Sequence, residues 1–251
     1  MTAVVMALAL DDALPLAWFI AGITKMGYDW DAKGSEAAFR RAIDAGPGDA
    51  RGYSGLGYTL AAQGRLAEGL THVLRAVELD PSTPIWTANA GLICRWMRNH
   101  EGARAQLQKS LAVNPHFLLS RLELGRVYVA EGNLNEAALQ FRRAVSDSHD
   151  HPLAVGHLGY ALALLGERGE AEKSLARLRE LAERRFVLPS AVALVHLGLG
   201  DLDRVFESLN AALEQRELRL IHLGVDPIVD PLRSDPRFAT LLRRVGFAAN
   251  N

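Results

Sequence analysis

The chain has 251 residues, of which 49% are hydrophobic and 23% charged, with a formal net charge of -1. This composition is typical of a globular protein and excludes a largely disordered one. The charge gives no electrostatic reason to expect nucleic acid or an anionic membrane as the main partner.

Cys94 is the only cysteine of the chain, so no intrachain disulfide can form. A disulfide-stapled secreted domain is therefore not indicated, and a reducing compartment is favoured. We expect a cytoplasmic protein. A periplasmic location stays open if a transmembrane segment precedes this sequence.

The N-terminal segment contains two apolar runs that must be weighed as targeting or membrane segments. No Lys or Arg precedes the run at residues 2–10, and Asp11 and Asp12 end it, so it does not fit a signal peptide. The run at residues 13–23 contains Pro15 and is too short to cross a bilayer. Both runs are interpreted as helical segments of a soluble array, and no membrane insertion is expected.

Most of the chain follows a pattern with a period of 34 residues, kept in register over five consecutive units. Apolar residues at helical spacing form one stripe on each of two segments per unit, which predicts a helical hairpin. Glycine inside a helix costs about 1 kcal/mol relative to alanine, so a recurring small residue indicates close approach of the paired helix. This position holds Gly57, Gly91, Gly125, Gly159 and Ala193.

A further unit precedes these five, but it needs one extra residue around residues 28–31 to stay in phase. Extending the pattern upstream places residues 1–14 in the second half of another hairpin, as a half-repeat. Solenoid ends normally carry a polar capping element, yet residues 1–14 are largely apolar. We therefore expect this end to be uncapped and able to contact a partner or a second copy of the chain.

The units resemble tetratricopeptide repeats in their period, their small residue and the prolines Pro81 and Pro115 that close two of them. The resemblance covers about nine tenths of the chain. It implies an all-α fold, a right-handed α-solenoid of helical hairpins. The expected organisation is a half-repeat at 1–14, six repeats at 15–219 and a tail at 220–251.

The tail leaves the repeat pattern and contains three Asp-Pro steps, which suit helix starts with Asp as the N-cap and Pro at the first helical position. After Asp235, apolar residues follow at helical spacing, and Gly246 fits the position beyond a helix end. The tail therefore predicts a capping helix over the sixth repeat.

Two segments, residues 28–43 and 225–246, resemble the repeat region that follows an effector domain in many bacterial signalling proteins. These relatives include winged-helix transcriptional activators, serine/threonine kinases and adenylate-cyclase-like proteins. The resemblance implies a regulatory or interaction module whose output domain is not in this chain.

No catalytic constellation is apparent in the sequence. Ser54 lacks the following glycine of a nucleophile elbow, because Leu56 stands there. His149, Asp150 and His151 could present metal ligands, but zinc sites need three or four ligands in fixed geometry, so a solvated loop is the better interpretation. We expect no enzyme activity, no cofactor and no metal.

The remaining candidate is the concave groove that the resemblance implies for the first helices of the units. It suits an amphipathic helix or an extended peptide. Glu123 and Arg126 are expected to face this groove without a role in the fold, while Asn89 and Arg126 alone do not reproduce the carboxylate clamp of chaperone-binding relatives. The predicted groove residues are Arg51, Tyr58, Asn89, Leu92, Arg95, Trp96, Glu123, Arg126, His157 and Tyr160.

The sequence thus predicts a non-catalytic scaffold that binds another protein or peptide, as part of a bacterial signalling protein. The alternative is a free-standing adaptor that forms a homodimer through its uncapped N-terminal face.

Overall fold

The computed structural model describes residues 13–246, and this part of the chain is helical without a β-strand. Six helical hairpins follow one another along the described chain. They are α2 (Pro15–Thr24) with α3 (Ala32–Ala45), α4 (Ala50–Ala62) with α5 (Leu66–Leu79), α6 (Pro84–Trp96) with α7 (His100–Val113), α8 (Leu118–Ala130) with α9 (Leu134–Asp147), α10 (Pro152–Leu164) with α11 (Arg168–Ala182), and α12 (Pro189–Leu199) with α13 (Leu202–Glu214). The predicted all-α solenoid is confirmed.

The recurring small residue lies where the two helices of a hairpin come closest. A β-carbon at Gly125 would lie 2.4 Å from Cε1 of Phe141 in α9. At Gly57 it would lie 2.5 Å from the backbone oxygen of Gly69 in α5. Both distances are shorter than van der Waals contact allows, so a side chain here would push the helices apart.

The first helix of most hairpins ends in a left-handed residue, as the glycine pattern predicts. Gly64, Gly132, Gly166 and Gly200 have φ between 75° and 91°. The hairpin α6/α7 has no glycine at this place, and Arg98 adopts the left-handed conformation instead, with φ 59°.

The first hairpin accommodates its extra residue in a π-helical segment, η1 (Lys25–Asp29), which continues directly from α2. Trp30 then takes a left-handed conformation with φ 55°, and Asp31 caps α3 by accepting a hydrogen bond from the backbone nitrogen of Gly34. A π-helical turn is the usual way to fit one additional residue into an α-helix.

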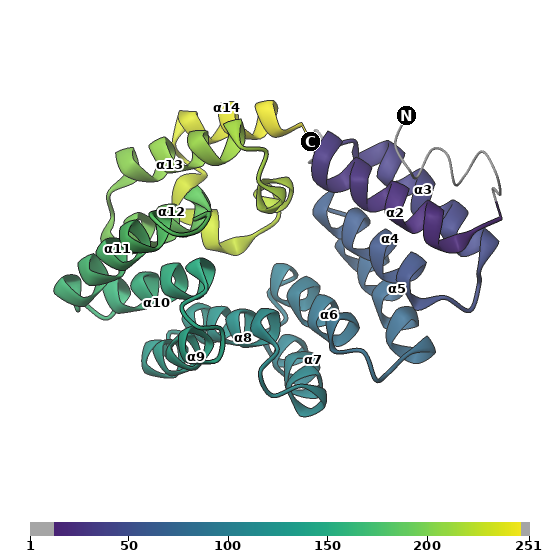
Figure 1. Ribbon diagram of the computed structural model, residues 1–251, viewed down its shortest axis with the longest axis horizontal. Helices are drawn as coiled ribbons and strands as arrows, with labels where there is room; N and C mark the ends of the chain where they lie inside the picture. The colour runs from purple at the N-terminus through teal and green to yellow at the C-terminus, as the bar shows by residue number, and fades with distance from the viewer. Residues whose placement is uncertain (1–12, 247–251) are drawn as a thin grey trace.

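The six hairpins curve until the last repeat approaches the first, so that the ribbon forms a nearly closed ring (Figure 1). Arg216, just after α13, donates a hydrogen bond to the carbonyl oxygen of Tyr28 at 2.9 Å. Its guanidinium also lies over the Trp30 ring, 5.6 Å from the ring centroid. Met26 and Leu220 are buried in one apolar cluster, so the contact between the ends includes core packing.

The chain after α13 enters the centre of the ring before it reaches the outer rim. Two short 3₁₀ helices, η2 (Leu218–His222) and η3 (Pro227–Leu232), lie inside the curve of the solenoid (Figure 1). The last helix, α14 (Pro236–Val245), packs on α13, where Phe206 and Leu209 share a core with Phe238 and Leu241. Residues 1–12, which hold nearly all of the expected half-repeat, lie outside the described residues.

Candidate functional site

The inner surface of the ring is formed by the first helices of the hairpins, and residues 218–233, here called the inner tail, lie against it (Figure 1). Side chains from α4, α6 and α8 contact the inner tail directly. The candidate site is therefore a contact between the repeat array and a later segment of the same chain.

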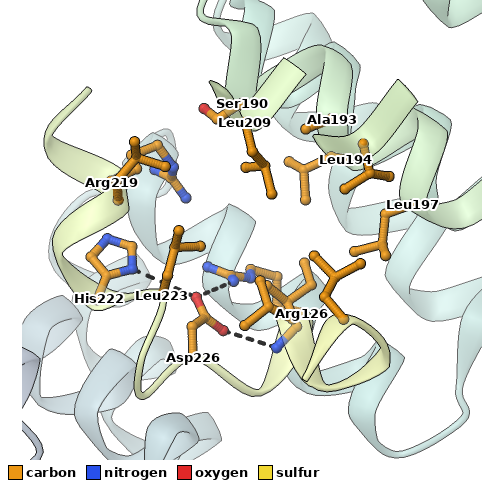
Figure 2. Close-up of a pocket in the computed structure, with 15 residues that line it drawn as sticks. Arg126, Ser190, Ala193, Leu194, Leu197, Leu209, Arg219, His222, Leu223 and Asp226 are labelled. Atoms are coloured by element: carbon orange, nitrogen blue, oxygen red, sulfur yellow. Dashed lines mark hydrogen bonds and ion pairs between the residues drawn. The ribbon is translucent and has the colours of Figure 1, made fainter. Parts of the chain in front are cut away.

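At the centre of this contact, two arginines and two carboxylates alternate in a closed ring of ion pairs. Arg95 donates from Nη1 to Oδ1 of Asp226 at 2.8 Å and from Nε to Oε2 of Glu123 at 2.6 Å. Arg126 donates from Nη1 to Oε1 of Glu123 at 2.9 Å and from Nη2 to Oδ2 of Asp226. Figure 2 shows the contact of Arg126 with Asp226. All four side chains are at least 95% buried.

The two carboxylates of this ring stay ionised because the arginines outweigh the cost of burial. Burial alone would raise the pKa of Glu123, but Arg126 and Arg95 lower it to about 2. The same two arginines hold the pKa of Asp226 well below its ordinary value against the opposing effect of burial. Removing any one of the four side chains would leave an uncompensated charge inside the protein. The free energy lost in this way is larger than the stabilisation that the intact ring provides.

Next to the ion pairs, three aromatic rings join the inner tail to the array. His222 of η2 lies 5.2 Å from Trp96 and 6.3 Å from Tyr58, measured between ring centroids, and Tyr58 lies 5.8 Å from Trp96. Burial lowers the pKa of His222 to about 3 despite the nearby Asp226, so the imidazole is neutral at pH 7. Burial raises the pKa of Tyr58 to about 12.

The inner tail is also braced by contacts within itself. Asp226 accepts a hydrogen bond from the backbone nitrogen of Ile228 at 3.1 Å, so the same carboxylate caps η3 and binds both arginines. Arg233 donates to the carbonyl oxygens of Gly224 and Asp226. These bonds close a loop that presents the Asp226 carboxylate to the arginines.

The remaining predicted groove residues divide into two sets. Tyr160 is buried beside Arg95 and Arg126 in the wall of a cavity of about 310 Å³ that η3 completes. Leu92 belongs to an apolar cluster against which Val225 of the inner tail packs.

The other three have local roles away from the ion pairs. Arg51 forms its ion pair with Asp49 at the start of α4. Asn89 donates to Oγ of Ser54 at 3.1 Å. His157 is fully buried, with its ring 5.3 Å from that of Phe141 and its pKa lowered to about 3 by burial.

Glu123 and Arg126 lie on the inner surface, but the expectation that they have no role in the fold is wrong. Both are buried, and their charges are satisfied by each other, by Arg95 and by Asp226. Arg126 does bind a carboxylate, but Arg95, rather than Asn89, completes the clamp.

The inner-tail residues Arg219, His222 and Asp226 were not among the predicted site residues. Asp226 carried one signal, the Asp-Pro step, which predicted its role as a helix cap but not its distant partners.

The loop at residues 149–151 is held by ordinary protein contacts. Asp150 pairs with Arg177, and Nδ1 of His151 accepts a hydrogen bond from the backbone nitrogen of Leu153 at the start of α10. Within residues 13–246, no group of three or more His, Cys, Asp or Glu side chains could hold a metal ion. Over the same residues, no helix has the length and apolar character needed to span a bilayer.

A tetratricopeptide repeat model matches residues 31–84, 97–152 and 122–186, which together make up more than half of the chain. The chain belongs to the tetratricopeptide repeat family. Proteins of this fold are scaffolds for protein–protein contacts, and this is the broad class that the family membership supports.

Among curated proteins, the chain is similar to "DnaJ homolog subfamily C member 3" of Homo sapiens. The two are 26% identical over 171 residues, which are 65% of this chain and 30% of the relative. The counterpart of Mus musculus is also 26% identical, over 166 residues. The chain therefore spans less than a third of the length of these curated relatives.

Solved structures show the same fold at low sequence identity. PilW, described as a widely conserved type IV pilus biogenesis factor, superposes with a TM-score of 0.63 and 24% identity, covering 72% of this chain and 84% of PilW. The Cut9–Hcn1 structure gives a TM-score of 0.67 and 18% identity, covering 96% of this chain and 45% of that one. PilF of Pseudomonas aeruginosa gives 0.60 and 13%, covering 94% and 99%.

Proposed function

We propose that this protein is a non-catalytic scaffold that binds an extended segment of a partner protein on its inner surface, through a carboxylate of that segment. The observation that carries the proposal is Asp226, which lies between Arg95 and Arg126 although 131 and 100 residues separate it from them. The inner tail is then an intramolecular occupant of the surface that a partner would use.

The contacts of the inner tail describe the chemistry such a partner needs. Its carboxylate must enter the space between two guanidinium groups, which favour paired oxygen acceptors. Apolar residues must flank the carboxylate, as Val225 and Val229 do in the inner tail. An Asp-Pro segment in a tight turn meets both requirements, since Asp226 caps η3 while it binds the arginines.

An intramolecular occupant makes binding conditional. A segment tethered by a short connection competes at an effective concentration in the millimolar range. A free partner must therefore bind considerably more tightly than the inner tail or arrive when the inner tail has been released. This arrangement suits a regulated scaffold better than a permanently open one.

A fluorescent peptide with the sequence of residues 218–234 tests the proposal in trans. We expect the full chain carrying Asp226→Asn to bind this peptide about tenfold or more tightly than the unchanged chain does, because the internal competitor is weakened. Fluorescence anisotropy measures both affinities, and circular dichroism shows that the variant remains folded.

Two controls distinguish recognition of the carboxylate from non-specific binding of the peptide. A peptide with asparagine at the position of Asp226, and with the aspartate at the position of Asp230 kept, should bind the variant about tenfold less tightly. The chain with Arg168→Ala, which loses only an exposed pair with Glu172 within α11, should bind the peptide as the unchanged chain does. Equal affinity for the two peptides would overturn the proposal.

We further propose that the scaffold is the regulatory part of a bacterial signalling protein and acts in the cytoplasm. The support is the resemblance of residues 28–43 and 225–246 to repeat regions of such proteins. These two segments flank the ring closure, where Arg216 contacts Tyr28 and Trp30. The gene sequence upstream of Met1 tests this proposal: an in-frame effector domain supports it, and an unrelated separate gene contradicts it.

A free-standing adaptor that self-associates is the second candidate, and the outer face of α2 favours it. Leu16, Ile20 and Ile23 are between 39% and 46% exposed there. Light scattering of the chain at high concentration tests this candidate. A dimer that is lost with Ile20→Glu but kept with Leu139→Glu, an equally exposed leucine of α9, would support it, whereas a monomer would contradict it.

A further inference from the structure

The cavity of about 310 Å³ beside Tyr160 lies between η3 of the inner tail and the helices α8 and α10 of the array. On this measure a water molecule needs about 10–15 Å³, so the space is large enough for a small-molecule ligand. Both the array and the inner tail supply apolar side chains to its wall, namely Val129, Ala130, Pro227, Ile228 and Pro231. A ligand in this cavity would contact both parts of the protein.

Tyr160 is a polar group of this wall that lacks a partner. The residue is only 7% exposed, and its hydroxyl makes no hydrogen bond to any residue between 13 and 246. Burial raises the pKa of Tyr160, so the hydroxyl keeps its proton at neutral pH and can donate it to an acceptor. An acceptor oxygen of a ligand would satisfy this donor.

The buried charges beside the cavity cancel one another. Arg95 and Arg126 line the cavity, and the two carboxylates of the ion-pair ring balance them. An ionised ligand would therefore bring a charge without a counterpart into a largely apolar space, which is unfavourable. The cavity thus favours an uncharged ligand.

Two further groups of charges do not change this balance. At the start of the inner tail, buried Glu217 and half-buried Arg219 carry one charge of each sign. At the opening of the cavity, Arg98 and Arg233 both pair with Asp230. These three side chains are exposed enough for water and salt to screen them.

The two arginines of the wall nevertheless keep hydrogen-bond donors that their ion pairs do not use. A guanidinium has more N–H groups than the three bonds of Arg95 or the two of Arg126 require. Nε of Arg126 has no partner among the described residues. Asp230, which also lines the cavity, has carboxylate lone pairs left to accept. Donors in the wall and an acceptor at the opening match the two polar ends of an amide group.

We propose that this cavity binds a small, uncharged aliphatic amide. Its carbonyl oxygen accepts a hydrogen bond from the Tyr160 hydroxyl, its N–H faces Asp230, and its hydrocarbon part packs on Ile228. Such a ligand contacts α10 and the inner tail at once, so it stabilises the inner tail in its docked position. The site is distinct from the place of the Asp226 carboxylate between the arginines, and it does not require a partner protein.

Cyclohexanecarboxamide is a suitable probe, and cyclohexanecarboxylate is its charged counterpart of nearly the same shape. We expect a ligand-observed NMR titration of the full chain to show saturable binding of the amide, with the carboxylate binding about tenfold or more weakly. Tyr160→Phe should weaken binding of the amide about fivefold, because one hydrogen bond is lost while the ring stays. Tyr128→Phe, the same change at a tyrosine of α8 outside the cavity wall, should leave the affinity unchanged.

Ala130→Trp tests the cavity itself while Tyr160 stays intact. Ala130 is exposed at the end of α8 and lines the cavity, so a larger side chain there fills the space without entering the core of a repeat. Binding of the amide should be abolished, and circular dichroism shows that the variant remains folded.

Proteolysis tests the effect of the amide on the inner tail. At about ten times the Kd of the amide, tryptic cleavage after Arg219 should slow about tenfold in the unchanged chain and by less than about twofold in the Ala130→Trp chain. The proposal is overturned by no saturable binding of the amide, by equal or tighter binding of the carboxylate, by unchanged affinity in either the Tyr160→Phe or the Ala130→Trp chain, or by cleavage that the amide does not slow. The trans-peptide experiment, which measures recognition of the Asp226 carboxylate, does not depend on any of these results.

Discussion

Gly125 of α8 contacts Phe141 of α9 within one repeat, whereas Arg126, the next residue along α8, contacts Asp226, which is 100 residues away. The first contact is local, apolar and repeated with small changes along the chain. The second is distant, ionic and made once in the described structure. Neighbouring residues of one helix thus belong to two interfaces, one held by apolar packing and the other by buried ion pairs.

This difference indicates that the two interfaces are sensitive to different kinds of substitution. The contact between α8 and α9 depends on volume, since a close-packed interface has no room for added atoms. The contact between the inner tail and the array depends on charge balance, because its four central side chains are buried ions. A change of charge should therefore release the inner tail while the repeats stay folded.

The largest effect is expected from Asp226→Ala. It leaves Arg95 and Arg126 facing one carboxylate, and breaking a buried pair costs about 3–5 kcal/mol. Tryptic cleavage after Arg219, which needs local opening of the inner tail, should accelerate by roughly the corresponding factor of 100 or more. Asp230→Ala removes two partly exposed pairs, with Arg98 and with Arg233, and should change the cleavage rate by less than about tenfold. Equal rates in the two variants would contradict the role given to Asp226.

A smaller effect is expected at the repeat interface. Gly125→Leu places a side chain against Phe141 and should lower the free energy of unfolding by about 1–3 kcal/mol. Gly169→Leu makes the same change in α11, where nothing lies within 4 Å of an added β-carbon, and should be neutral or slightly stabilising. Denaturant titration measures both variants, and an unchanged midpoint for Gly125→Leu would show that the close approach does not matter.

His222, in the aromatic contact of the inner tail, predicts that the free energy of unfolding depends on pH. The pKa of His222 is about 3 in the folded protein and about 6.5 when unfolded. Below pH 6.5 the unfolded chain therefore binds a proton that the folded chain does not, so stability falls with falling pH down to about pH 3. His222→Phe should reduce this slope by about 1.4 kcal/mol per pH unit.

The slope is best measured between pH 5.5 and pH 4.5, where Glu123 contributes little. The pKa of Glu123 is lowered to about 2, so its stabilising effect is present above its unfolded pKa of about 4.3 and is lost only as pH falls below that value toward 2. Denaturant titrations at several pH values in this interval measure the slope for the unchanged and the His222→Phe chains. An identical slope in the unchanged and His222→Phe chains would show that His222 is not buried as a neutral group.

The smallest effect is expected at the ring closure. Arg216→Ala removes an exposed cation–π contact with Trp30 and one hydrogen bond to Tyr28, together worth about 0.5–1 kcal/mol. Arg41→Ala removes the corresponding contact with Trp18 inside the first repeat. Both should lower stability slightly, but only Arg216→Ala should increase the radius of gyration in small-angle scattering. The same radius for both variants would contradict a role for Arg216 in closing the ring.

The sequence predicted what is periodic or local. The hairpins, the close approach at Gly125 and the left-handed glycines follow from spacing and from the steric rules for glycine. Asp235 caps α14 by accepting from the backbone nitrogen of Arg237, and Gly246 ends that helix with φ 67°. The extra residue near Trp30 was visible as a phase shift, although its π-helical form was not.

The course of the inner tail was not predictable in this way. Nothing in the spacing of Asp226 distinguishes it from Asp230, yet Asp226 binds two buried arginines and Asp230 binds two exposed ones. Their difference arises only when the superhelix curves far enough to bring residues 218–233 against α6 and α8. That curvature is a sum of small rotations at each repeat, which a single sequence does not specify.

Hydrogen exchange of the backbone amides tests the central claim most directly, comparing the unchanged chain with Asp226→Asn. If the inner tail is an exchangeable occupant, amides in residues 218–233, such as that of Asp226, which donates to His222, should exchange faster in the variant by about 100-fold or more. Amides of α8 and α9 should keep their rates. Acceleration spread evenly over the tail and the repeats, or no acceleration in either, would contradict the account.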